Sequence, residues 1–106
     1  MTNHTPSSVL EKLHSETALM HWKDLQRFFA QGKVLFVDKS LNLVNTAALF
    51  ANDSVTELEP IISSELVCAP NNNQARSWFD ANVELWTVVV APYVLVQEAK
   101  GEGLQN

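Results

Sequence analysis

The run Leu85-Trp86-Thr87-Val88-Val89-Val90-Ala91-Pro92-Tyr93-Val94-Leu95-Val96-Gln97, near the carboxyl end, is the most strongly β-forming part of the 106-residue sequence. It is rich in valine and almost wholly apolar, as is typical of a strand buried on both faces. Pro92 has no N–H to donate to a sheet ladder, so it marks a bend, a bulge or an edge. Since no common turn-forming pair interrupts the run, we expect one bent strand over residues 85–97 rather than a hairpin.

Two shorter β-forming runs lie upstream and predict strands at residues 33–38 and 65–69. Elsewhere the spacing of apolar residues is helical, and it predicts helices at about 7–19, 22–31, 41–51, 55–64 and 74–79. The first two helices are separated by a break near Met20-His21, because the apolar stripe shifts around the helix there. Pro60 should kink the fourth helix or divide it into two short turns. Ser40 should cap the third helix, and an asparagine from the run 71–73 should cap the fifth.

These elements predict an α+β fold in which about five helices pack on a small three-stranded sheet. Both gaps between strands are long enough for a crossover helix, so the sheet is allowed to be partly parallel. A chain of this length has enough surface to bury for one core. We expect a single globular domain over residues 7–98, between a disordered N-terminus at 1–6 and a disordered tail at 99–106.

The charge of the chain is acidic and unevenly placed. There are 12 Asp and Glu against 7 Lys and Arg, which gives a net charge of −5. Residues 1–40 carry a net charge of +1, whereas residues 41–106 carry −6. Only Lys23, Arg27 and Lys33 lie close together, as on a solvated helix face, and the acidic half would repel a phosphate backbone. We therefore expect no nucleic acid among the partners.

Several classes of protein are disfavoured by features that the sequence lacks. Residues 1–8 include neither a basic segment nor an apolar one, so no secretory signal is visible. The longest apolar run is shorter than the roughly 20 residues that a membrane helix needs. Cys68 is the single cysteine and cannot form an internal disulfide, and the three glycines form no phosphate-binding loop. We expect a cytoplasmic protein with no membrane partner.

The candidate catalytic and metal-binding residues all have simpler interpretations. Glu11 and His14 have the spacing of a di-iron motif, but a second such motif is missing and both should face water. His14 and His21 are two helical turns apart, which is too far to share one zinc ion unless the break between the helices brings them together, so surface histidines are favoured. Cys68 lies between apolar neighbours and is expected to be a small buried residue. We expect no catalytic residue, no metal and no cofactor, and we favour a binding protein over an enzyme.

A cleft for a small molecule would be expected at the carboxyl ends of the strands. Asp38 follows the first predicted strand at such an end, and Ser40, Asn71 and Gln97 would line the cleft with it. The simpler alternative is that Asp38 or Ser40 caps the helix that follows.

Three aromatic residues, Trp22, Trp86 and Tyr93, are candidates for an interface, because the polar groups of Trp and Tyr seek partners there. The valine-rich run adds a reason, since an uncharged β-forming segment aggregates unless its faces and edges are covered. We therefore expect a non-catalytic protein-interaction module that binds a protein partner or a second copy of itself, as a homodimer. The alternative is a small-molecule-binding domain or minor enzyme with its cleft near Asp38.

The chain also resembles a known bacterial family. The most specific shared segment is Val90-Ala91-Pro92-Tyr93-Val94-Leu95-Val96-Gln97. Further shared positions are Glu16-Thr17-Ala18, Trp22, Leu25, Phe28-Phe29-Ala30, Gly32, Leu41, Leu43-Val44, Ala47-Ala48, Gln74-Ala75 and Trp78. Over about residues 10–98 the sequence is similar to domain-of-unknown-function family 2288, whose pattern we expect to carry an acid where this chain has Asn42. The resemblance implies an uncharacterised bacterial cytosolic protein and brings no reaction, cofactor or site residue with it.

Overall fold

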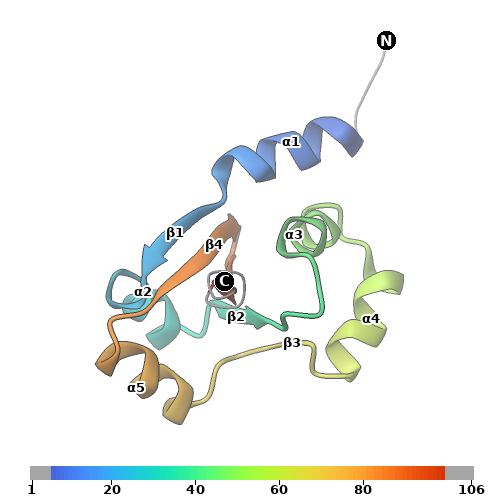
Figure 1. The fold of residues 1–106 in the computed structure, drawn as a ribbon. Helices are drawn as coiled ribbons and strands as arrows, with labels where there is room; N and C mark the ends of the chain where they lie inside the picture. Colours follow the sequence, from blue (N-terminus) through green and yellow to red (C-terminus); the bar gives the residue numbers. More distant parts are fainter. Residues whose placement is uncertain (1–5, 100–106) are drawn as a thin grey trace.

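The computed structural model describes residues 6–99, and within that range the chain forms five helices and five strands (Figure 1). The helices are α1 (Pro6–Glu16), α2 (Trp22–Ala30), α3 (Leu43–Ala51), α4 (Val55–Ser63) and α5 (Asn72–Asp80). The strands are β1 (Ala18–His21), β2 (Val34–Val37), β3 (Val67–Cys68), β4 (Glu84–Val90) and β5 (Tyr93–Glu98). The disorder predicted for the two ends concerns mainly residues 1–5 and 100–106, which lie outside the described range.

The strands form one mixed sheet in the order β1-β4-β5-β2-β3. β4 lies antiparallel between β1 and β5, whereas β2 runs parallel to β5 and antiparallel to β3. The α+β class and the five helices are confirmed for the described residues. The sheet is partly parallel through β2 and β5, whereas the first two predicted strands, β2 and β3, pair antiparallel. The prediction of three strands is wrong, because the sheet has five.

One of the two additional strands arises because the valine-rich run is a hairpin and not a single bent strand. β4 and β5 pair from Leu85 with Glu98 to Val90 with Tyr93, and Ala91 and Pro92 form the turn. Pro92 lies where no ladder N–H is needed, so it does not weaken the sheet. The sequence-based prediction failed because it required a glycine or asparagine pair, although proline is also a turn residue.

The other additional strand, β1, lies at the predicted break between the first two helices. The break is therefore real, but the chain there is extended, and it pairs with β4 from Ala18 with Thr87 to His21 with Glu84. Ala, Leu and Met favour helix over strand, so local preference does not predict β1. A tertiary contact, the pairing with β4, overrides that preference.

Two local details of the helices bear on the prediction. α4 is one helix that contains Pro60, so it does not divide into two short turns, and the kink stays a prediction. Pro60 and Thr56 are both exposed, so water can bond to the Thr56 carbonyl that the proline leaves without a partner. Asn42, and not Ser40, caps α3: its side-chain oxygen accepts the Asn45 N–H at 2.9 Å.

Helices cover both faces of the sheet, and each face has its own core (Figure 1). On the α1/α3 face the buried residues are Leu13, Val37, Leu43, Val44, Ala47, Val67, Val88 and Leu95. On the α2/α5 face they are Trp22, Leu25, Val34, Ala75, Trp78, Leu85, Val94 and Val96. Because side chains alternate along a strand, three consecutive residues of β5, Val94, Leu95 and Val96, are buried in opposite cores.

Candidate functional site

The outer edge of β4 is paired along only part of its length. β1 pairs with residues 84–87 of β4, and β5 occupies the other side of the strand. Within residues 6–99, no strand pairs with residues 88–90 on the β1 side. An unpaired strand edge presents free N–H and C=O groups that another extended chain can bond to.

Beside this free edge lies an open concavity of about 790 Å³ between α2 and the sheet. Its apolar lining comes from β1, α2, β4 and β5, and consists of Met20, Leu25, Phe28, Val89 and Val94. Its polar lining consists of Thr87 from β4 and of Lys23, Asp24, Gln26 and Arg27 from α2. We call this concavity the α2 groove. Val89 is the most accessible apolar group in it, with 58% of its surface exposed.

Two basic side chains on the wall of the α2 groove, those of Lys23 and Arg27, lie over aromatic rings. The Lys23 Nζ lies 5.1 Å from the centre of the Phe79 ring, and the Arg27 guanidinium carbon lies 5.1 Å from the centre of the Phe28 ring. The one contact within 4.0 Å between a basic side chain and a carboxylate in the described part of the chain joins His21 to Glu84, with Nε2 and Oε2 3.6 Å apart. Lys23 and Arg27 therefore have no carboxylate within 4.0 Å among these residues.

Asp38, Ser40 and Gln97, three of the residues predicted to line a small-molecule cleft, do come together. The Gln97 Nε2 donates to the Asp38 carbonyl at 3.0 Å and to the Leu41 carbonyl at 2.8 Å. The Asp38 carboxylate accepts the Ser40 backbone N–H at 2.9 Å. That bond, reinforced by the Ser40 hydroxyl, lowers the pKa of Asp38 below its ordinary value of 3.8. These bonds fold the connection between β2 and α3 and leave few polar groups free for a ligand.

Asn71, the fourth residue of the predicted cleft, has a local role as well. Its side-chain oxygen accepts the Gln74 N–H at 2.8 Å and so caps α5. Asp38 does line a small concavity of about 260 Å³, but its other lining residues are Phe36, Lys39, Gln74 and Glu98, without Asn71. Asn71 follows β3, which runs antiparallel to β2, so it does not leave the sheet at the same end as Asp38.

The three aromatic residues predicted at an interface lie in three different environments. Trp22 is fully buried on the α2/α5 face, with its ring centre 5.0 Å from that of Trp78, and it belongs to the core rather than to a surface. Trp86 is half-buried against the α1/α3 face. Tyr93 is 37% exposed at the hairpin turn and meets Phe50 edge to face. The structure does not bring them to one surface.

The sequence analysis did not predict that Val89 is exposed or that the pairing of β1 with β4 stops at Thr87. Val89 lies in the middle of the valine-rich run, and nothing in its neighbours distinguishes it from buried Val88. A signal did exist for the cations, since Lys23 and Arg27 are one helical turn apart. Their position against the sheet depends on how α2 docks, which a sequence pattern does not contain.

The remaining candidates form no further cluster. In residues 6–99, no three His, Cys, Asp or Glu side chains are placed to hold a metal ion together. Cys68 was predicted to be buried, but it is exposed, because β3 is an edge strand and Val67 is its inward residue. Over the same residues, no helix is long and apolar enough to cross a lipid bilayer.

Comparison with known proteins places the chain in a family. No curated protein matches the sequence. The chain is similar to PA1075 from Pseudomonas aeruginosa, a protein with an NMR solution structure: the two are 38% identical and superpose with a TM-score of 0.74. The match covers 92% of this chain and 90% of that protein. The family described as "Protein of unknown function (DUF2288)" matches residues 8–98, so the chain belongs to the DUF2288 family.

Proposed function

We propose that this protein is a non-catalytic interaction module that binds a segment of another protein chain in the α2 groove, along the free edge of β4. The observation that carries the proposal is the exposure of Val89, a β-branched residue in the longest strand, beside a concavity of about 790 Å³. Exposed apolar surfaces with a polar rim mark sites of protein interaction, and grooves of this kind bind segments of other chains.

The free edge supports the same proposal through backbone chemistry. An extended segment placed beside residues 88–90, next to the point where the chain passes from α1 into β1, would gain main-chain hydrogen bonds. Its side chains on the groove side would cover Val89 and Phe28 and remove their apolar surface from water. Backbone pairing supplies affinity in such complexes, and the groove supplies selectivity.

The homodimer expected from the sequence is the version of this proposal in which the bound segment belongs to a second copy of the chain. We place the binding in the cytoplasm, where reducing conditions keep the exposed Cys68 thiol free.

The alternative function, a small-molecule cleft near Asp38, receives less support. The amide donors of Gln97 are taken up by two backbone carbonyls, and the Asp38 carboxylate already accepts a backbone N–H. The concavity beside Asp38 is about a third of the volume of the α2 groove. Neither Ser40 nor Gln97 lines that concavity.

The test compares two exposed valines. Val89→Asp places a charge in the α2 groove, and Val55→Asp places the same charge on α4, where Val55 is 65% exposed. The wild type and both variants are immobilised and exposed to bacterial lysate, and the retained proteins are identified by mass spectrometry. Sedimentation velocity of each at high micromolar concentration measures self-association, and circular dichroism checks that each is folded.

We expect the wild type and Val55→Asp to retain the same protein, or to form the same dimer, and Val89→Asp to lose it by tenfold or more. Loss in both variants, loss in neither, or a wild type that stays monomeric and retains nothing would contradict the proposal. Since both valines are exposed, a folding defect in Val89→Asp alone is not expected.

A further inference from the structure

We infer that the occupant of the α2 groove is an extended segment that carries a carboxylate beside apolar side chains. This inference rests on the proposed function and names the chemistry of the partner. Its basis is that the groove has an apolar floor and a wall with two cations that the protein's own carboxylates leave unpaired.

The cations are notable because the chain as a whole is acidic. With a net charge of −5, acids outnumber bases, yet neither Lys23 nor Arg27 lies within 4.0 Å of a carboxylate in the described residues. Asp24 is the one carboxylate among the groove residues, and it pairs with neither. Each cation instead lies over a ring, Phe79 or Phe28, which leaves its other side open to a partner.

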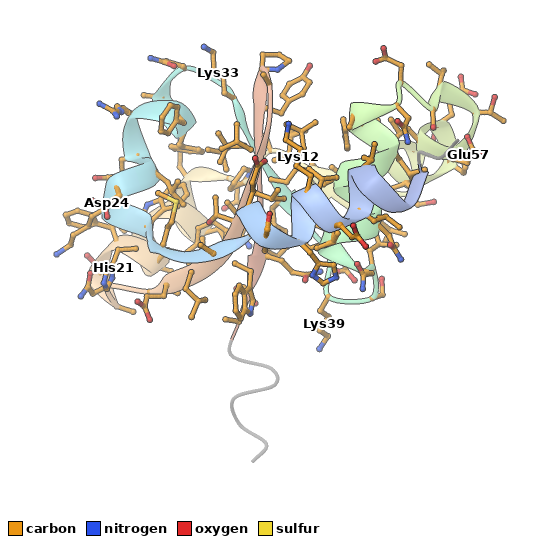
Figure 2. The ribbon with its side chains drawn as sticks, turned by 90° about the horizontal axis from the view of Figure 1, so that it is seen from above. Lys12, His21, Asp24, Lys33, Lys39 and Glu57 are labelled. Atoms are coloured by element: carbon orange, nitrogen blue, oxygen red, sulfur yellow. The ribbon has the colours of Figure 1, made fainter. Side chains whose placement is uncertain are left out.

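The backbone of a third basic residue borders the groove floor. The Lys33 carbonyl accepts the Val94 N–H at 2.9 Å, and Val94 is part of the floor. Figure 2 shows Lys33 on the same side of the molecule as α2, whereas Glu57 lies at the far side, on α4. The charged residues that line the groove, Lys23, Arg27 and Asp24, sum to +1 in a chain whose net charge is −5, so the groove attracts an acidic segment more than a basic one.

The pleat of a strand fixes the pattern of the segment. Residues i, i+2 and i+4 of a bound strand lie on one face, so one such triplet would face the groove. Apolar side chains in it would cover Val89 and Phe28, and a carboxylate between them would reach the α2 wall that carries Arg27. A symmetric pair of this chain docked groove to groove would instead bring its cations together, so charge favours a different partner.

The probe is a fluorescein-labelled heptapeptide, Ser-Val-Ser-Glu-Ser-Val-Ser, in which two valines and the glutamate share one strand face. Its control peptides carry lysine or serine in place of the glutamate. Fluorescence anisotropy at low salt measures their binding to the wild type, to Arg27→Glu and to Arg76→Glu, whose exposed arginine lies on α5.

We expect the wild type and Arg76→Glu to bind the glutamate peptide about tenfold more tightly than the lysine peptide, and Arg27→Glu to reverse that order. Added salt should reduce the difference. Equal affinity for all three peptides, combined with loss of binding in Val89→Asp, would overturn the inference and leave the proposed function in place. Binding of none of the peptides would also overturn the inference, and the valine comparison would then decide the proposed function separately.

Discussion

Val88 and Val89 are neighbours in β4, and the contrast between them shows how differently the two faces of the sheet are covered. Val88 belongs to the core of the α1/α3 face and is 1% exposed. Val89 points to the α2/α5 face and is 58% exposed. Chemically identical residues, one position apart, therefore have a core role and a surface role.

The docking of the helices, and not their length, explains the contrast. α3 has nine residues, as α2 and α5 do, but α3 contacts β4. α2 and α5 have nine residues each, and their aromatic core gathers around Trp22, Trp78 and Leu85, at the start of β4. On the other face both α1 and α3 contact β4, so the cover extends to Val88. The uncovered end of β4 forms the floor of the α2 groove.

The largest expected effect compares one substitution on the two faces. Trp22→Ala removes a fully buried ring from the α2/α5 core, and we expect the free energy of unfolding to fall by about 3–5 kcal/mol. Trp86→Ala, on the α1/α3 face, removes a half-buried ring, and we expect a loss of about 2 kcal/mol or less. Urea denaturation measures both. An equal loss in the two variants would show that the aromatic core is not the main support of its face.

The next effect concerns the hydrogen bonds of the Gln97 side chain, near the end of β5, to the connection between β2 and α3. Gln97→Met keeps the length of the side chain but removes both donors to the Asp38 and Leu41 carbonyls. We expect a loss of about 2 kcal/mol in the free energy of unfolding, about 1 for each bond. Gln74→Met on α5, for which the described residues show no side-chain hydrogen bond, is the matched control and should change stability by less than about 0.5 kcal/mol. Similar losses in both would refute a specific role of Gln97.

Two helix N-caps, one on each face of the sheet, test whether the capped helices contribute equally to stability. Asn42 caps α3 on one face and Asn71 caps α5 on the other, with acceptor distances of 2.9 and 2.8 Å. Each substitution by alanine should cost about 1 kcal/mol, because each leaves one helix N–H without its partner. Thermal and urea unfolding measure both. A markedly smaller cost at Asn71 would mean that α5 is partly detached, which would sharpen the contrast between the faces.

The smallest effect is a pH dependence at the connection between β2 and α3. Because the Ser40 N–H lowers the pKa of Asp38 in the folded state, ionised Asp38 contributes stability above its ordinary pKa of 3.8, and this contribution is lost as the pH falls through the folded value. The wild type should therefore exceed Asp38→Asn slightly in stability at neutral pH, and the difference should vanish in acid. A pH series of urea midpoints tests this, and a difference that grows in acid would contradict the assignment.

Much of the fold follows from local pattern. The positions of α2, α3 and α5, the strand β2 and the break after α1 could be predicted, because apolar spacing and turn residues act over a few neighbours. β1 could not, since Ala, Leu and Met there acquire strand geometry only through pairing with β4. The hairpin was missed for the opposite reason: the apolar run continues through its turn at Pro92.

The candidate site divides in the same way. Asp38, Ser40 and Gln97 were expected to line one cleft. Hydrogen bonds join them at the edge where the parallel strands β2 and β5 end, and their role in binding stays a prediction. The hydrogen bonds among them occupy polar groups of Asp38 and Gln97 that could otherwise bind a ligand. Such bonds depend on interatomic distances, which a sequence pattern does not contain. The proposed groove was not predicted, because it is bounded by segments far apart in the sequence.

By itself, the sequence determined the α+β class, the acidic charge and the helices and strands whose residues favour them locally. Only the tertiary structure decided which valine is exposed to water, where along β4 the pairing with β1 stops, and which basic side chains line the α2 groove. The reason is that burial depends on what lies opposite a side chain, and for β4 that is set by the docking of helices encoded elsewhere in the chain.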